Sequence, residues 1–261
     1  MANESMGVPA PTANPRGVDA GRGAGWWGEA WRLFARSPGT WILIVVILFV
    51  LNIVLAVIPF VGSLAGQLLF PLFAGGLMLG CRALDRGEAL SVNHLFAGFG
   101  QRSGALFVAG LIYTALALAI IFVVVGLLIL FFGTAILSTL WKLGDPISGA
   151  ALLGEMFSAI LVGALLFLLL YLPLIMAIWF TPALIALRGM EPLQAMKLSL
   201  LGCARNIVPF LLYGIIGIAL ALVATIPLML GWLVLGPVTI ASIYTSYCDI
   251  YEDEPATAAA V

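Results

Sequence analysis

The charged residues of this 261-residue chain are clustered, and they leave four long stretches without a single charge. These stretches are 37–81, 103–141, 156–187 and 206–248. A helix needs about 20 apolar residues to cross a hydrocarbon core of about 30 Å. Because each stretch is longer than that, the four together have room for six to eight crossings. The pattern predicts an all-α, polytopic helical membrane protein.

The overall composition supports this class. Charged residues make up 9% of the chain and hydrophobic residues 63%, whereas a soluble domain has about 25% and about 45–50%. A chain with so little charge cannot cover a water-facing surface, which excludes a soluble globular protein. The net charge is −1 and no basic run stands out, so we expect no nucleic-acid partner.

The charge-free stretches divide most simply into six transmembrane helices that form three hairpins. The first hairpin has an uncharged turn at 59–63, the middle one a polar loop at 142–146, and the last one a turn near Gly231. The predicted spans are about 41–58, 64–84, 104–126, 160–187, 207–230 and 233–251.

The middle hairpin is too long for two simple crossings. As one helix, residues 104–141 would run for about 57 Å at about 1.5 Å per residue. A break at Gly126 or Gly133 would turn the excess, from Leu127 onward, into an interfacial or re-entrant helix. The alternative is two additional spans within 127–160. The sequence leaves both open.

The basic residues predict the orientation. Ten of the eleven Lys and Arg residues precede the first predicted span or lie between spans two and three or four and five, and only Lys142 lies on the opposite side. Positive residues accumulate in short cytoplasmic loops. We therefore expect both termini to be cytoplasmic.

Two terminal tails flank the predicted transmembrane domain, which covers 26–251. Residues 1–25 are rich in Gly, Pro and Ala and contain no apolar run, so they are not typical of a signal peptide. We expect them to form a disordered cytoplasmic tail. Residues 252–261 are predicted to form a cytoplasmic C-terminal tail.

Landmarks recur along the chain and suggest an internal repeat. Each return helix carries one of the prolines Pro71, Pro173 and Pro237. A basic residue followed by a small polar one opens each hairpin: Arg36-Ser37, Arg102-Ser103 and Arg205-Asn206. We interpret this as three pseudo-repeated hairpins, each preceded by an amphipathic linker on the cytoplasmic side. Chance agreement in apolar sequence is the alternative.

Aromatic side chains are candidates for anchors at the membrane interface. Before the first predicted span, Trp27, Trp31 and Phe34 fall on one helical stripe, with the arginines away from it. Such a helix lies in the headgroup layer with its aromatic rings at the interface. A second group of candidate anchors lies near the end of the last span: Tyr244, Tyr247 and Tyr251.

Five uncharged polar residues are candidate intramembrane sites. Asn52 and Gln67 are the most polar residues of the first predicted hairpin. Polar groups in membranes bond neighbouring helices, and we favour this interpretation over substrate contact. One face of the last predicted span carries the other three: Thr239, Ser242 and Ser246. This face is the best candidate for a cavity wall.

One segment resembles a known group of proteins. Residues 191–199, EPLQAMKLS, are followed by Arg205, Asn206 and a new span. This pattern resembles a linker in uncharacterised bacterial inner-membrane proteins, a group similar to the membrane domain of some glycerophosphoryl diester phosphodiesterases. The resemblance covers 26–251 and implies a helical inner-membrane protein. Those enzymes carry catalysis in a separate soluble barrel domain, so their activity and catalytic residues are not transferred to this chain.

Chemistry-bearing side chains are scarce in the spans. The charge-free stretches contain no Asp, Glu, Lys, Arg or His, which disfavours acid–base catalysis, metal binding and ion-coupled transport. We expect no enzymatic activity, no catalytic residue, no cofactor and no metal. The leading prediction is a structural or accessory module that contacts the lipid bilayer and a membrane-protein partner or a second copy of itself. The alternative is a transporter or lipid-handling protein for an uncharged or lipidic substrate.

Overall fold

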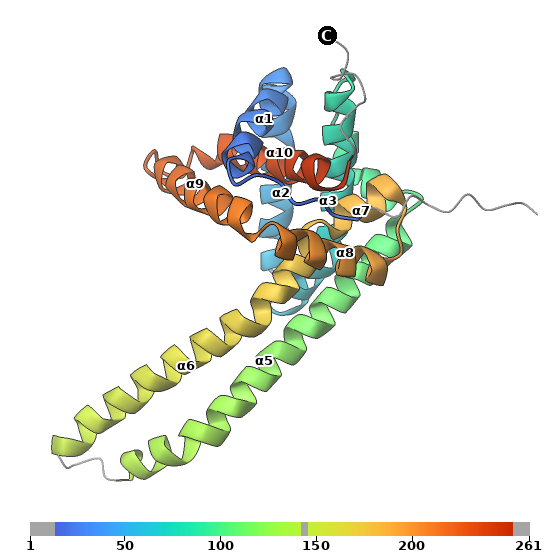
Figure 1. Ribbon diagram of the computed structural model, residues 1–261. Helices are drawn as coiled ribbons and strands as arrows, with labels where there is room; N and C mark the ends of the chain where they lie inside the picture. Colours follow the sequence, from blue (N-terminus) through green and yellow to red (C-terminus); the bar gives the residue numbers. More distant parts are fainter. Residues whose placement is uncertain (1–13, 142–145, 253–261) are drawn as a thin grey trace, which may run out of the picture.

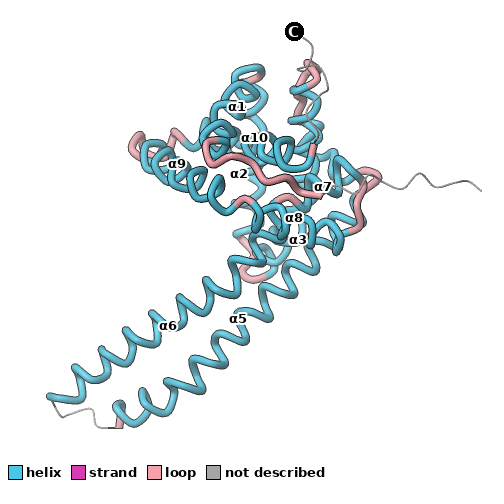
Figure 2. The backbone as a smooth tube through the Cα atoms, in the orientation of Figure 1, coloured by secondary structure: helices cyan, strands magenta, loops and turns pink. Residues whose placement is uncertain are grey.

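The structure is a computed structural model that describes residues 14–141 and 146–252. All regular elements in these two ranges are helical, as the cyan segments of Figure 2 show. In chain order (Figure 1) they are α1 (Arg22–Arg36), α2 (Pro38–Ala56), α3 (Val61–Asp85), α4 (Asn93–Phe96), the short 3-10 helix η1 (Ala97–Phe99), α5 (Ser103–Leu140), α6 (Pro146–Trp179), α7 (Thr181–Arg188), α8 (Pro192–Arg205), α9 (Ile207–Thr225) and α10 (Trp232–Tyr251).

Six helical segments within the described residues are long and apolar enough to cross a membrane. They pair along the chain as α2 with α3, α5 with α6, and α9 with α10. The segments are Pro38–Ala56, Val61–Asp85, Ser103–Gly133, Leu153–Arg188, Ile207–Thr225 and Trp232–Tyr251. The predicted all-helical class is confirmed, and the number of helices apolar enough to span a membrane equals the predicted number of spans.

The buried core lies at one end of the three helix pairs, and we call this end the root zone. It contains the starts of α2, α5 and α9, the ends of α3 and α10, and the short helices between the pairs. Along α3, Val61 beside the turn is 62% exposed, whereas Cys81 near the other end is 0% exposed. The turn ends of the pairs, the tips, expose large apolar side chains. Such tips need an apolar environment, which lipid provides.

Glycines allow η1 and α4 to pack directly on the main chain of α3. A Cβ atom on Gly76 would lie 2.4 Å from the carbonyl oxygen of His94, and one on Gly98 would lie 1.9 Å from that of Leu72. A Cβ on Gly110 of α5 would lie 2.6 Å from the carbonyl oxygen of Leu68. These contacts place the start of α5 beside the middle of α3, so α5 extends well beyond the turn between α2 and α3.

Helices α5 and α6 form a long arm that leaves the root zone (Figure 1). The expected break at Gly126 or Gly133 is wrong, because α5 continues through both glycines to Leu140. A glycine inside a helix costs only about 1 kcal/mol relative to alanine. In apolar surroundings a break would leave main-chain groups without hydrogen bonds, which costs more. Lys142 and Asp145, which lie between α5 and α6 in the sequence, are outside the described residues.

The fourth predicted span, 160–187, is divided at Phe180. Helix α6 ends at Trp179 and α7 begins at Thr181, with Pro182 in its first turn. Proline lacks an N–H group and is favoured in that first turn. At the break between the two helices, the main-chain N–H of Phe180 donates to Ser199 Oγ on α8, at 2.9 Å. The break therefore ties the end of the arm to α8.

The N-terminal tail begins its contacts earlier than the sequence predicts. The prediction assigned residues 1–25 to a disordered tail, but residues 14–21 lie against the root zone and α1 begins at Arg22. Residues 1–13 and, at the other end, 253–261 lie outside the described residues.

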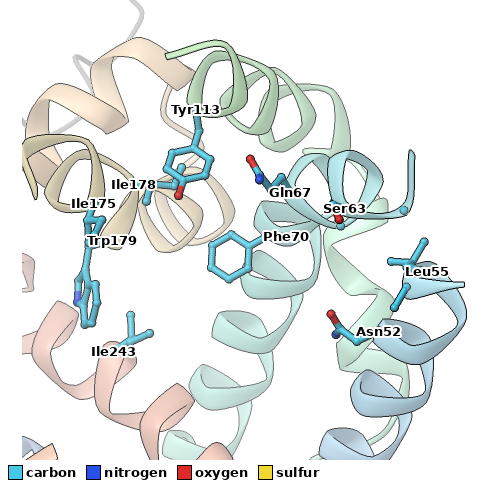
Figure 3. Close-up of a pocket in the computed structure, with 13 residues that line it drawn as sticks. Asn52, Leu55, Ser63, Gln67, Phe70, Tyr113, Ile175, Ile178, Trp179 and Ile243 are labelled. Carbon is cyan, nitrogen blue, oxygen red and sulfur yellow. The ribbon is translucent and has the colours of Figure 1, made fainter. Parts of the chain in front are cut away.

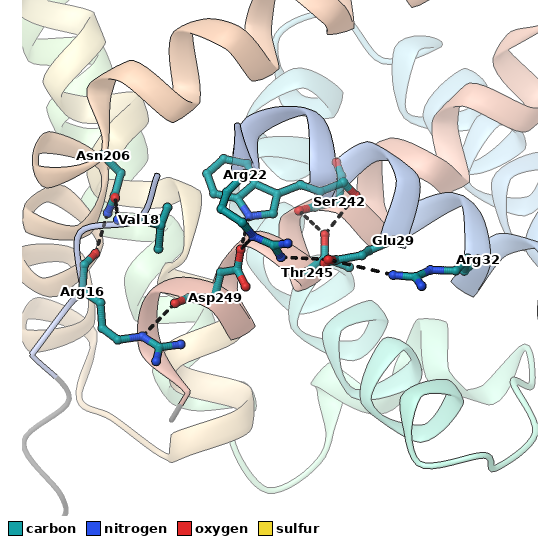
Figure 4. Close-up of polar contacts among 10 residues, drawn as sticks. Arg16, Val18, Arg22, Glu29, Arg32, Asn206, Ser242, Thr245 and Asp249 are labelled. Carbon is teal, nitrogen blue, oxygen red and sulfur yellow. Dashed lines mark hydrogen bonds and ion pairs between the residues drawn. The ribbon is translucent and has the colours of Figure 1, made fainter. Parts of the chain in front are cut away.

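Polar side chains hold this N-terminal segment in place (Figure 4). The buried Asn206 accepts a hydrogen bond from the N–H of Val18 and donates one to the carbonyl oxygen of Arg16, each at 2.8 Å. Arg16 Nε donates to the carbonyl oxygen of Asp249 at 3.0 Å, and Arg22 Nε donates to the Asp249 carboxylate at 2.5 Å. The glycine- and proline-rich composition of this segment did not indicate this packing, because all of these contacts join residues that are far apart in the sequence.

Candidate functional site

A cavity of about 520 Å³ lies between the first two helix pairs and α10 (Figure 3). Its walls are mostly aliphatic and aromatic, and no charged side chain lines it among the residues that the structure describes. The lining residues are Asn52, Leu55, Ala56, Gly62, Ser63, Gly66, Gln67, Phe70, Tyr113, Ile175, Ile178, Trp179 and Ile243. The two polar residues predicted in the first hairpin, Asn52 and Gln67, therefore meet in one cavity.

The two amides differ in how their hydrogen bonds are satisfied. Asn52 Nδ2 donates to the carbonyl oxygen of Leu48, one helical turn earlier, at 2.9 Å. The exposed amide of Gln67 has no hydrogen-bonding partner within 14–141 and 146–252. Figure 3 shows the Gln67 amide and the Tyr113 hydroxyl pointing toward the same space. A bound molecule with a polar group would find both at this wall.

A pair of tyrosines joins the two helices of the arm beside the cavity. The hydroxyl oxygens of Tyr113 on α5 and Tyr171 on α6 lie 2.6 Å apart. One hydroxyl must donate to the other, so the proton of the second remains free to donate elsewhere. The ring of Tyr171 stacks on Phe167 with 4.7 Å between the centroids. The stacking holds the ring of Tyr171, and the Tyr113 side chain that it bonds lines the cavity.

The second predicted polar group lies outside this cavity. Thr239 Oγ1 donates to the carbonyl oxygen of Leu235 at 2.8 Å, within its own helix. The buried Ser242 and Tyr213 share a hydrogen bond of 2.8 Å between their hydroxyls. Ser246 is buried and donates to the carbonyl oxygen of Ile243 at 3.0 Å. Thr239 and Ser246 thus bond main-chain groups of their own helix, and Ser242 bonds Tyr213 of α9. None of the three lines the cavity.

The aromatic residues of α1 have different surroundings. The buried Trp27 stacks on Tyr213 of α9 at 4.7 Å between centroids, and its Nε1 donates to the carbonyl oxygen of Tyr213 at 3.1 Å. Phe34 is also buried, whereas Trp31 is 54% exposed. Membrane anchoring by this stripe stays a prediction, and Trp31 is the member that the protein leaves uncovered.

The three tyrosines of α10 are buried in the root zone and bond three other helices. The Tyr244 hydroxyl donates to the Asp85 carboxylate at 3.2 Å, and the Tyr247 hydroxyl accepts from Arg188 Nε at 3.0 Å. The Tyr251 hydroxyl donates to the carbonyl oxygen of Leu198 at 2.9 Å. These bonds join α10 to α3, α7 and α8. Contact of the three rings with the membrane interface stays a prediction.

The root zone contains buried thiols, which lie outside the cavity. Burial raises the pKa of the Cys203 thiol on α8 to about 12, so this thiol stays protonated at neutral pH. Cys81 is buried too, as expected for small packing residues. Within the described ranges, no three His, Cys, Asp or Glu side chains are grouped so that they could hold a metal ion.

The sequence analysis did not single out the tyrosine pair. A signal was present, because Tyr113 and Tyr171 are the two tyrosines of the middle pair of spans. A hydroxyl in an apolar span needs a partner, and each is the natural partner of the other. Trp179 and Ile243 carry no such signal, since only the tertiary packing brings them to the cavity.

Comparison with known proteins agrees with the membrane assignment. The chain is similar to a probable inner membrane protein of Burkholderia thailandensis, with 28% identity over 250 residues that cover 90% of each chain. No protein-family model matches the chain, and no solved structure matches it. The six apolar helices of the chain fit an integral membrane protein, and the relative is a probable inner membrane protein. None of these findings connects it with glycerophosphoryl diester phosphodiesterases.

Proposed function

We propose that this chain is a non-catalytic inner-membrane protein that holds an uncharged or lipidic ligand in the cavity lined by Asn52, Gln67 and Tyr113. The observation that carries the proposal is the unpartnered amide of Gln67 on a mostly apolar wall. A polar group left without a partner in apolar surroundings costs about 1–3 kcal/mol. A ligand with an ester, hydroxyl or amide group would remove that cost.

The lining also limits the charge of the ligand. The described residues around the cavity provide amides, hydroxyls and apolar side chains and no ionised group. An ionised ligand would lose its hydration without gaining a counter-charge, which is strongly unfavourable. A volume of about 520 Å³ falls within the usual range of about 300–1,000 Å³ for small-molecule sites. An uncharged lipid such as a diacylglycerol has the matching chemistry.

A photoactivatable diacylglycerol tests the proposal with the full chain in nanodiscs. We expect crosslinks to peptides of α3 and α5 that unlabelled diacylglycerol competes away. Gln67→Leu should reduce crosslinking about tenfold, which corresponds to about 1.4 kcal/mol. Thr239→Val is the matched control, since Thr239 is an intramembrane polar residue outside the cavity. Equal crosslinking in wild type and Gln67→Leu would reject this site.

The orientation and the internal repeat belong to the same proposal. In our account both termini are cytoplasmic and the root zone faces the cytoplasm, because ten of the eleven basic residues lie on that side of the predicted spans. What supports the repeat is the spacing of helix ends. Helices α3, α7 and α10 end at Asp85, Arg188 and Tyr251, which are 14, 15 and 14 residues after Pro71, Pro173 and Pro237.

The accessory role is the second candidate, and the arm formed by α5 and α6 favours it. Helix α5 has 38 residues, about 57 Å of helix, against a hydrocarbon core of about 30 Å. Its outward side chains are apolar, with Phe122 76% exposed. A membrane-protein partner or a second copy of this chain would cover this excess surface.

Site-specific photocrosslinking distinguishes a protein partner from lipid. A benzophenone side chain at Phe122 should give a discrete protein adduct in native membranes if the arm binds a partner. The same group at Ile218 on α9, which is also exposed and apolar, is the control and should crosslink to lipid. Lipid adducts alone at both positions would reject the accessory role of the arm.

A further inference from the structure

A second cavity, of about 330 Å³, lies in the root zone and is lined by charges of both signs. Its polar walls are formed by Glu29, Arg32 and Arg36 from α1, Asp85 from α3, and Tyr244 and Asp249 from α10. It shares no residue with the cavity of the proposed function. Its chemistry therefore needs a separate account.

Two of the carboxylates in this cavity are already paired. Arg22 binds both of them, with 2.5 Å from its Nε to Asp249 and 2.8 Å from its Nη2 to Glu29 (Figure 4). Trp26 Nε1 donates to the same Asp249 carboxylate at 2.7 Å. The bonds to Asp249 fix α1 against α10. The two ion pairs of Arg22 leave little capacity for a ligand at Asp249 and Glu29.

The remaining charges lie close together without neutralising each other. Arg36 Nη1 donates to the main-chain carbonyl oxygens of Leu84 and Asp85, and no ion pair joins it to a carboxylate among the described residues. Asp85 accepts from the Tyr244 hydroxyl at 3.2 Å and has no ion pair in the same part of the chain. Arg32 is 73% exposed and only 3.9 Å from Glu29, at the limit of an ion pair.

The mixed charges select a ligand that carries both signs. A simple anion would meet the guanidinium groups but face the carboxylate of Asp85, and a simple cation would face Arg32 and Arg36. A phosphate fits the planar donors of guanidinium groups. A primary ammonium group fits Asp85, to which it can donate hydrogen bonds. A zwitterion with both groups, such as phosphoethanolamine, satisfies both walls of the cavity.

The position of the cavity indicates the source of this zwitterion. Arg36 lies two residues before the start of α2, and Asp85 is the last residue of α3. The cavity is therefore at the charged end of this helix pair, where the apolar stretch 37–81 begins and ends. In a bilayer, basic residues that flank a span lie at the depth of the headgroups. The half-exposed Trp31 is next to Arg32.

We propose that this root-zone cavity binds the phosphoethanolamine headgroup of a membrane phospholipid, with the phosphate on Arg32 and Arg36 and the ammonium on Asp85. This site is independent of the ligand in the first cavity. It would fix the protein to one class of lipid on the face where the root zone lies.

Native mass spectrometry of the full chain tests the headgroup. The protein is released from nanodiscs made of equal parts of phosphatidylethanolamine, phosphatidylcholine and phosphatidylglycerol. We expect phosphatidylethanolamine to be enriched about tenfold over both others, equivalent to about 1.4 kcal/mol. Asp85→Asn keeps the acceptor for Tyr244 and should abolish this enrichment. Arg32→Gln should reduce the amount of all bound phospholipids.

Matched controls and a soluble probe complete the test. Glu88→Gln and Arg86→Gln change exposed charges outside the cavity and should behave as wild type. Gln67→Leu should leave the enrichment unchanged, which separates this site from the proposed function. The proposal is overturned if wild type shows no enrichment, if Asp85→Asn retains it, or if the controls lose it equally. Soluble phosphoethanolamine binding as tightly as the lipid would also overturn the assignment to a lipid.

Discussion

At the scale of single residues, the side-chain amides of Asn206 and Gln67 differ in whether the protein satisfies their hydrogen bonds. Asn206 is 1% exposed and uses its whole amide on main-chain groups of the N-terminal segment and of α8. Gln67 is exposed toward the cavity and uses none of its amide within the described chain. We infer that the first amide stabilises the fold, whereas the second is available to a ligand.

Asn206→Ala should release the N-terminal segment. The substitution leaves the N–H of Val18 and the carbonyl oxygen of Arg16 without their partner, which costs about 1–3 kcal/mol. We expect trypsin to cleave after Arg16 faster than in wild type, as measured by mass spectrometry of the products. Asn93→Ala changes an exposed asparagine of α4 and serves as the control. Equal cleavage rates in all three proteins would contradict this role of Asn206.

At the scale of single elements, the sequence predicted where helices occur better than what they pack against. The starts and ends of α2, α3, α9 and α10 lie within five residues of the predicted spans, because turns and charges mark them. The stripe with Trp27 predicts an amphipathic helix, but such a stripe packs against lipid in some proteins and against other helices in others. The structure covers Trp27 with Tyr213, a contact between residues far apart in sequence that periodicity cannot reveal.

Gly98→Ala should weaken the contact between η1 and α3. The new Cβ would lie 1.9 Å from the carbonyl oxygen of Leu72, which belongs to helical main chain and cannot move freely. Forced overpacking of this kind costs about 1–3 kcal/mol, so we expect a lower thermal unfolding midpoint in detergent. Gly104→Ala, with nothing within 4 Å of its Cβ, should not lower it. A Gly98→Ala protein as stable as wild type would contradict the close packing.

At the scale of the whole molecule, three apolar helix pairs share one buried root zone, and two cavities of opposite character lie between them. The sequence predicts the number of pairs and the end at which the charges gather, since both follow from where charged residues occur. It does not predict that Asn52 and Gln67 share a cavity while Thr239 lies outside it. That outcome depends on how α10 crosses the first two pairs.

The orientation of the molecule can be tested with two reporters. A fusion after Asp145, between α5 and α6 in the sequence, should report an external location, and one at the C-terminus a cytoplasmic location. The physical reason is the strong bias of basic residues to the cytoplasmic side. The opposite pattern would contradict this orientation, since the root zone and its phosphoethanolamine site would then lie on the external side of the membrane.

The central claim is that the first cavity holds an uncharged or lipidic ligand, and a cryo-electron microscopy structure of the full chain in native-lipid nanodiscs tests it most directly. Our account predicts continuous non-protein density between the Gln67 amide and the Tyr113 hydroxyl, reduced in Gln67→Leu. The account would be contradicted if movement of α10 or the arm closed the cavity of about 520 Å³ and Gln67 were bonded to another helix.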